Sequence, residues 1–177
     1  EQALGAFTGA PFVVMTDCCT HALELCLRLE VPKRVEIPAR TYISVPMTLR
    51  KLDTPYIFQD TDWVGEYQIT NTRIWDSARK LSMGMYRKGQ LQCLSFGYDK
   101  PLEIGHGGAI LLDDAQAYKI LLAQRYDGRD LSISPWQDQK VFRMGYHYRP
   151  TIEDAVKGLE LLPTVDQEPK YKEYPDL

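Results

Sequence analysis

Polar side chains that could bind a ligand or take part in catalysis follow several of the predicted strands. They fall at Asp17 to Thr20, at Tyr42, at Asp76 and at Ser95 to Lys100. In α/β proteins, ligand sites gather where strands end and where loops or helix N-termini begin. Each residue alone has an ordinary structural interpretation, because such a lysine is usually solvated, such an aspartate usually caps a turn and such a threonine usually caps a helix. Their joint order along the chain is what indicates a site.

The cysteines and histidines lack the spacing of a zinc site. No CxxC pair is present, and the three histidines are dispersed at His21, His106 and His147. We therefore expect no metal site. The cysteines are expected to be reduced thiols that act as small hydrophobic residues in a cytoplasmic protein. They are Cys18, Cys19, Cys26 and Cys93.

The elements that must position these residues alternate along the chain. Apolar runs rich in β-forming residues predict strands over residues 12–15, 35–37, 55–60, 73–76, 91–96 and 107–112. Apolar side chains at spacings of three and four predict helices over 20–29, 41–52, 113–125 and 151–162. Residues 61–71 are expected to form a loop or small hairpin. Such alternation favours an α/β fold, a three-layer α/β/α sandwich with a mostly parallel sheet.

Composition restricts the class of protein. The chain has 177 residues, 44% hydrophobic and 25% charged, with 21 basic and 24 acidic side chains, so its net charge is 21 − 24 = −3. This charge provides no field that would hold nucleic acid, and no apolar run approaches the roughly 18 residues needed to span a bilayer. We expect neither a nucleic-acid partner nor a membrane. The length predicts one domain over residues 1–162, followed by a tail over 163–177 that is too charged and proline-rich to pack.

Six short motifs follow one another along residues 1–162. They read DCCTHAL at 17–23, PARTY at 38–42, WDSAR at 75–79, SFGYDK at 95–100, GHGGA at 105–109 and GYHYRPT at 145–151. In this order they resemble the motifs of the DegT/DnrJ/StrS family of sugar aminotransferases, which depend on pyridoxal 5'-phosphate (PLP). The resemblance implies the PLP-dependent transferase fold of type I (aspartate aminotransferase-like), here as a truncated large domain.

The resemblance also implies roles for individual residues. Lys100 would form the internal aldimine with PLP and then act as general base. Asp76 would pair with the pyridinium nitrogen, and Tyr42 would stack on the ring. The other cofactor-binding residues that it implies are Cys19, Thr20, Arg79, Ser95, His147 and Arg149.

These further residues would serve different parts of the cofactor. Thr20 and Ser95 would donate hydrogen bonds to the phosphate, next to the Cys19 position of the phosphate loop. Arg79 matches the position beside the ring hydroxyl. His147 and Arg149 match a loop that reaches across a homodimer interface in the family.

The resemblance implies an aminotransferase that moves an amino group from an amino-acid donor to a keto-sugar nucleotide. The chain would be a shortened form, without about two strand–helix units between Asp62 and Arg73 and without the C-terminal small domain. Two alternatives stay open: a relative that binds PLP but transaminates poorly, and a non-catalytic member with an assembly or interaction role. The Cys18–Cys19 pair and Arg79 favour these alternatives, whereas Asp76, Ser95 and Lys100 favour PLP binding.

Overall fold

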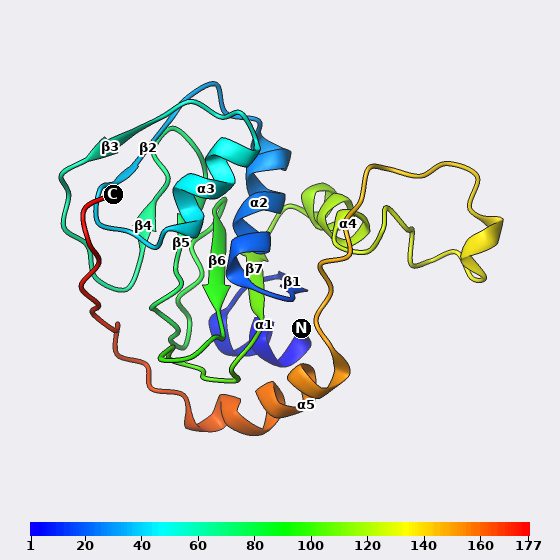
Figure 1. Cartoon of the computed structure of the whole chain (residues 1–177). Helices are drawn as coiled ribbons and strands as arrows, with labels where there is room; N and C mark the ends of the chain where they lie inside the picture. Colours follow the sequence, from blue (N-terminus) through cyan, green and yellow to red (C-terminus); the bar gives the residue numbers. More distant parts are fainter.

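A five-stranded sheet runs through the computed structural model, which describes all 177 residues (Figure 1). The strand order across it is β1-β7-β6-β5-β4. Two further strands, β2 (Val35–Pro38) and β3 (Tyr56–Gln59), pair with each other in a separate parallel sheet. The strands of the main sheet are β1 (Phe12–Thr16), β4 (Tyr67–Gln68), β5 (Ile74–Asp76), β6 (Leu91–Ser95) and β7 (Gly108–Leu112).

The prediction of an α/β fold is confirmed, but the sheet is mixed rather than mostly parallel. Strand β7 is antiparallel to both β1 and β6, and β4 is antiparallel to β5. Within the main sheet only β5 and β6 are parallel neighbours. For β4 and β5 the reason is the short connection between them, which permits only an antiparallel pair. Parallel neighbours need a longer crossover.

Helices and loops cover the two faces of the sheet unequally. Helix α2 (Cys19–Glu30) packs on β6 and β7, with α3 (Ser44–Lys51) and α4 (Ala115–Gln124) beside it. The opposite face is covered by the short helix α1 (Gln2–Thr8), by loop residues such as Leu81 and Leu102, and by Leu162 after α5 (Ile152–Leu161). A complete third layer of helices, as the sandwich prediction required, is therefore not formed.

The alternation of side chains along β7 divides the core into two clusters. Ile110 and Leu112 face α2, whereas Ala109 and Leu111 face α1. All four side chains are fully buried. Successive side chains of a strand point to opposite faces, so a central strand covered on both sides reads as a continuous apolar run. This explains why the sequence of β7 contains no polar alternation.

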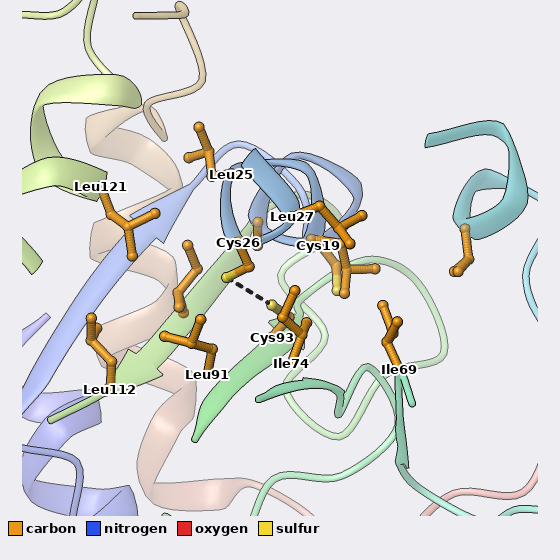
Figure 2. Packing of buried hydrophobic residues seen from close by; sticks show 14 of the residues in the cluster. Cys19, Leu25, Cys26, Leu27, Ile69, Ile74, Leu91, Cys93, Leu112 and Leu121 are labelled. Carbon is orange, nitrogen blue, oxygen red and sulfur yellow. Dashed lines mark hydrogen bonds between the residues drawn. The ribbon is translucent and has the colours of Figure 1, made fainter. Parts of the chain in front are cut away.

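Two cysteines join α2 to the sheet in the larger cluster. Figure 2 shows Cys26 of α2 directed at Cys93 of β6, with their sulfur atoms 3.6 Å apart. Both side chains are fully buried, and all four cysteines of the chain are free thiols. The structure thus has these two residues in the role of small core side chains.

Local capping explains where the helices begin. Asp114 accepts hydrogen bonds from the backbone N–H groups of Gln116 and Ala117, and Thr151 forms a capping box with Asp154. Pro46 lies in the first turn of α3, where its missing N–H has no intrahelical partner to lose. The predicted helix over 41–52 therefore begins later, at Ser44, and is otherwise intact.

The tail does not behave as its composition predicts. The backbone carbonyl of Lys170 accepts a hydrogen bond from Arg79 Nε (3.0 Å), and the Lys170 N–H donates one to the Arg79 carbonyl (2.9 Å). Further along, the Leu177 N–H donates to the carbonyl of Ala39. In Figure 1 this segment, drawn in red, runs along the edge of the molecule to β2 and β3. Side chains of the tail hold it as well, since Asp176 pairs with Arg40 (3.1 Å) and Gln167 accepts a hydrogen bond from the Met83 N–H (2.8 Å).

None of the helices combines the length and the apolar character that crossing a membrane requires.

The buried carboxylate of Glu66 ties the hairpin before β5 to the segment after it. It accepts hydrogen bonds from Ser77 (2.8 Å), Lys80 (2.7 Å) and Arg87 (2.7 and 3.0 Å). Burial opposes the charged form, but the hydrogen bonds from Arg87 and Lys80 outweigh it and lower the pKa of Glu66 to about 2. Since Ser77 directly follows Asp76, this network also fixes the end of β5.

We expect Glu66→Gln to lower the free energy of unfolding at pH 7 by on the order of 2 to 3 kcal/mol. The pKa in the folded state lies below the ordinary value of 4.5, so the stabilisation is complete above that pH and is lost as the pH falls toward 2. Urea denaturation at pH 7 and near pH 2 measures both values. Glu160→Gln, at an exposed position without an ion pair, is the control. An equal loss for Glu66→Gln at both pH values would contradict this account.

Candidate functional site

A cavity of about 360 Å³ lies at the edge of the sheet where three strands end. Strands β1 and β6 are both antiparallel to β7, and β5 is parallel to β6, so β1, β5 and β6 run in the same direction. Their carboxyl ends therefore meet at one edge. The cavity at this edge is lined by six of the nine residues implied by the family motifs, with Tyr42 coming from the loop after β2: Cys19, Thr20, Tyr42, Asp76, Ser95 and Lys100.

Asp76 supplies a buried carboxyl group to the floor of the cavity. Its Oδ1 accepts a hydrogen bond from the Ala78 N–H (3.0 Å), and its Oδ2 accepts one from the Tyr67 hydroxyl (3.1 Å). It forms no ion pair. Burial raises the pKa of Asp76 above its ordinary value, although these hydrogen bonds and the charge of Lys100 oppose the shift. A cation placed in the cavity would stabilise the ionised form.

Lys100 supplies an amine that is not committed to any partner. It follows β6 through a turn in which Asp99 adopts a positive φ of 60°. Its Nζ forms neither a hydrogen bond nor an ion pair, in contrast to Lys51 and Lys80, which both bind carboxylates. Burial lowers the pKa of the Lys100 ammonium below its ordinary value. A larger fraction of neutral amine makes this lysine a better nucleophile and base than a solvated lysine.

The N-terminus of α2 forms another wall of the cavity. Its N-cap residue, Cys18, makes no side-chain capping hydrogen bond, so the first N–H groups of the helix are not capped. Thr20 Oγ1 donates to Ser44 Oγ (2.9 Å), and Ser95 lines the cavity from the end of β6. Uncapped N–H groups together with hydroxyl groups are suited to binding an anion. Burial raises the pKa of the Cys19 thiol, so this side chain is a neutral part of the wall.

Aromatic side chains surround the mouth of the cavity. Tyr42 is 58% exposed and touches Tyr174 edge-on, at 6.5 Å between ring centroids. Tyr174 in turn stacks on Trp63 at 5.8 Å. Sequence reasoning found Tyr42 but not the other two. Trp63 lies in the aromatic segment 61–71, which was a weak signal, whereas no local pattern indicates that the tail contributes Tyr174 and Lys172 to the lining.

Three of the implied cofactor residues do not line the cavity. The Arg79 side chain is buried and binds the Lys170 carbonyl and Asp99 (2.9 Å) instead. His147 pairs with Asp127 at 3.1 Å, and Arg149 lies over the ring of Tyr126 at 4.6 Å. The latter two belong to the segment after the loop that follows α4, and the backbone of the residue between them, Tyr148, pairs with Arg125 and Asp17.

Comparison with solved structures identifies the fold. AtS13 from Actinomadura melliaura has a TM-score of 0.79 and 22% identity over 95% of this chain and 59% of that chain. A DegT DnrJ EryC1 StrS aminotransferase from Brucella abortus has a TM-score of 0.75 and 19% identity, and the match covers 92% of this chain and 57% of that chain. GDP-4-keto-6-deoxymannose-3-dehydratase (ColD), solved with GDP-perosamine bound, has a TM-score of 0.72 and 18% identity. The match covers 93% of this chain and 59% of that chain.

The chain therefore has the fold of the DegT/DnrJ/EryC1/StrS aminotransferases, and the resemblance seen in the six motifs is confirmed at the level of the fold. It spans less than two thirds of the length of the solved structures that it matches. No family model and no curated protein matches the sequence itself. At identities this low, the structural match establishes the fold but not the reaction, which has to be inferred from the residues of the site.

The contact between Tyr174 and Trp63 leads to a test of the tail. We expect Tyr174→Ala to make Trp63 more accessible to a neutral quencher and to lower the free energy of unfolding by about 1 kcal/mol, since an aromatic pair is lost. Acrylamide quenching of tryptophan fluorescence, repeated in a Trp63→Phe background, measures the first effect. Tyr171→Ala removes an exposed tyrosine of the same tail and should change neither value. Unchanged quenching in Tyr174→Ala would show that the tail does not cover Trp63 in solution.

Proposed function

We propose that the cavity binds PLP and that the protein transfers an amino group from an amino-acid donor to a keto-sugar nucleotide. The observation that carries this proposal is the pair formed by Asp76 and Lys100. A buried carboxyl group without a cationic partner and an amine without an anionic partner face the same cavity. This arrangement suits a ligand that offers a cationic ring nitrogen and a reactive carbonyl group.

The lining of the cavity fits the parts of PLP. Asp76 would hold the ring nitrogen in its protonated form, and the exposed ring of Tyr42 would cover one face of the cofactor. The uncapped start of α2, with Thr20 and Ser95, would bind the phosphate group. The volume of about 360 Å³ lies in the range of small-ligand pockets. When bound, PLP supplies an electron sink that stabilises negative charge on the substrate carbon next to the amino nitrogen.

Lys100 is assigned two tasks in the reaction. Its Nζ, whose pKa is lowered by burial, would hold the cofactor as the attacking nucleophile. The same Nζ would also serve as the general base and then the general acid that moves a proton at the substrate carbon. Tyr67 supports the opposite end of the site, because its hydroxyl donates to Asp76 while Thr41 lies 2.7 Å away on its other side.

The sugar-nucleotide substrate and the homodimer are parts of the same proposal. ColD, which shares the fold, was solved with GDP-perosamine, a nucleotide-linked sugar, and this supports the substrate class. His147 and Arg149 are exposed and do not line the cavity of their own chain. Their match to a family loop that reaches a neighbouring site supports a second copy as the place where they act.

The tail supports a second candidate function, a non-catalytic relative. Lys172 and Tyr174 line the cavity that the substrate would have to enter, and Tyr174 is held there by Trp63. A protein in which this segment stays in place would bind PLP weakly or turn over slowly, and would serve in assembly or interaction.

Addition of PLP to the full chain tests cofactor binding. We expect a visible absorption band in the wild type that is lost in Lys100→Ala, because the cofactor is then no longer attached. Lys172→Ala, at the other lysine that lines the cavity, should keep the band, as should Lys88→Ala on the surface. Loss of the band in Lys172→Ala together with its persistence in Lys100→Ala would refute the assignment of Lys100.

Addition of L-glutamate to the PLP-loaded protein separates the two candidate functions. An aminotransferase should lose the visible band and release 2-oxoglutarate in an amount equal to the bound cofactor. Asp76→Asn should slow this half-reaction by at least about 100-fold, because the ring nitrogen loses the anion that keeps it protonated. A wild-type band that persists with glutamate and with glutamine would support the non-catalytic candidate.

A further inference from the structure

A cluster of three potential metal ligands lies at the junction of β1 and α2. The ligand atoms of Asp17, Cys18 and His21 all lie within 4.8 Å of one another. The Asp17 Oδ1 is 2.7 Å from His21 Nδ1. The function proposed above gives Asp17 and His21 no task, and the spacing of the cysteines along the chain gave no signal for this cluster.

Helix geometry explains why these side chains meet. Cys18 is the N-cap of α2 and His21 is the third residue of the helix, so the two occupy the same face of the first turn. A serine or aspartate at the N-cap would use its side chain to cap the helix. The Cys18 side chain makes no such bond, so its sulfur is left free to point toward the imidazole.

The surrounding structure holds the three residues in place. The Asp17 N–H donates to the carbonyl of Tyr148 (2.8 Å). The ring of Tyr148 stacks on the His21 ring, with 3.6 Å between the ring centroids and 4° between the ring planes. Gly108 of β7 lies against the backbone of Cys18, where a Cβ would come within 2.5 Å of the Cys18 carbonyl carbon. Ligands fixed by such outer contacts lose little entropy when they bind a metal.

The geometry points to a binding site for a zinc-type dication at Asp17, Cys18 and His21. One thiolate, one imidazole and one carboxylate form the mixed ligand set that Zn²⁺ accepts, whereas Mg²⁺ and Ca²⁺ prefer oxygen ligands alone. The thiolate and the carboxylate together balance the charge of a dication. Binding releases the thiol proton of Cys18 and the proton that His21 shares with Asp17.

The site has three protein ligands, so a fourth, tetrahedral position is open. Cys18 also lines the cavity described above, which places the ion at the cavity rim. Metal binding does not depend on PLP, so it is measured in the absence of the cofactor, and its failure would leave the proposed reaction untouched.

Titration of the full chain with Co²⁺, as a spectroscopic substitute for Zn²⁺, tests the site. We expect one equivalent of Co²⁺ to produce a thiolate-to-metal charge-transfer band in the near ultraviolet. Cys18→Ser should abolish this band, and His21→Gln should weaken Zn²⁺ binding, measured by competition with a chelator, at least about 100-fold. Circular dichroism of each variant shows whether it is folded.

The matched control is His147→Gln. His147 also pairs with an aspartate, Asp127, but no cysteine lies beside it, so this variant should keep the band and the affinity. A measurement on the wild type alone gives a second readout: Zn²⁺ should protect Cys18 from iodoacetamide, as mapped by mass spectrometry. Absence of the band in the wild type, its persistence in Cys18→Ser, or unprotected Cys18 at saturating Zn²⁺ would overturn the proposal.

Discussion

The packing of helix α2 on the sheet is the constraint on which the rest of the structure depends. Its apolar face is buried against β6 and β7, with Cys26 and Cys93 in contact at the centre (Figure 2). At its start, the backbone of Cys18 lies so close to Gly108 that no side chain fits between them. The uncapped N-terminus of the helix is thereby held at the edge where β1, β5 and β6 end, and this contact sets one wall of the cavity.

The cavity contains two ionisable groups that have no oppositely charged partner within the protein. Asp76 is buried without a cation and Lys100 is half-buried without an anion. Burial therefore raises the pKa of Asp76 and lowers that of Lys100, which favours the neutral form of each. By contrast, Glu66 nearby is fully paired and its pKa falls. Unpaired buried groups cost stability, and they are tolerated where a ligand completes them. This contrast distinguishes Glu66, which stabilises the structure around the site, from Asp76 and Lys100, which are free to bind a ligand.

Local sequence patterns were sufficient for most of the elements. The helices predicted over 113–125 and 151–162 and the apolar run of β7 were readable, because each depends on neighbours within a few residues. Strand direction was not readable, since it depends on pairing between strands that are distant in the sequence, such as β1 and β7. The tail was misjudged for a similar reason: its composition is polar, but its backbone finds partners at Arg79 and Ala39, far away in the sequence.

For the site, the sequence by itself determined which chemical groups stand at strand ends: Asp76 after β5, Ser95 and Lys100 after β6, and Cys19 and Thr20 at the start of α2. Only the tertiary structure decided that these groups share one cavity, because the common direction of β1, β5 and β6 is set by hydrogen bonding between strands. It also decided that Trp63 and Tyr174 meet at its mouth and that Arg79 binds the tail instead. Contacts between distant segments arise from packing, which no local pattern encodes.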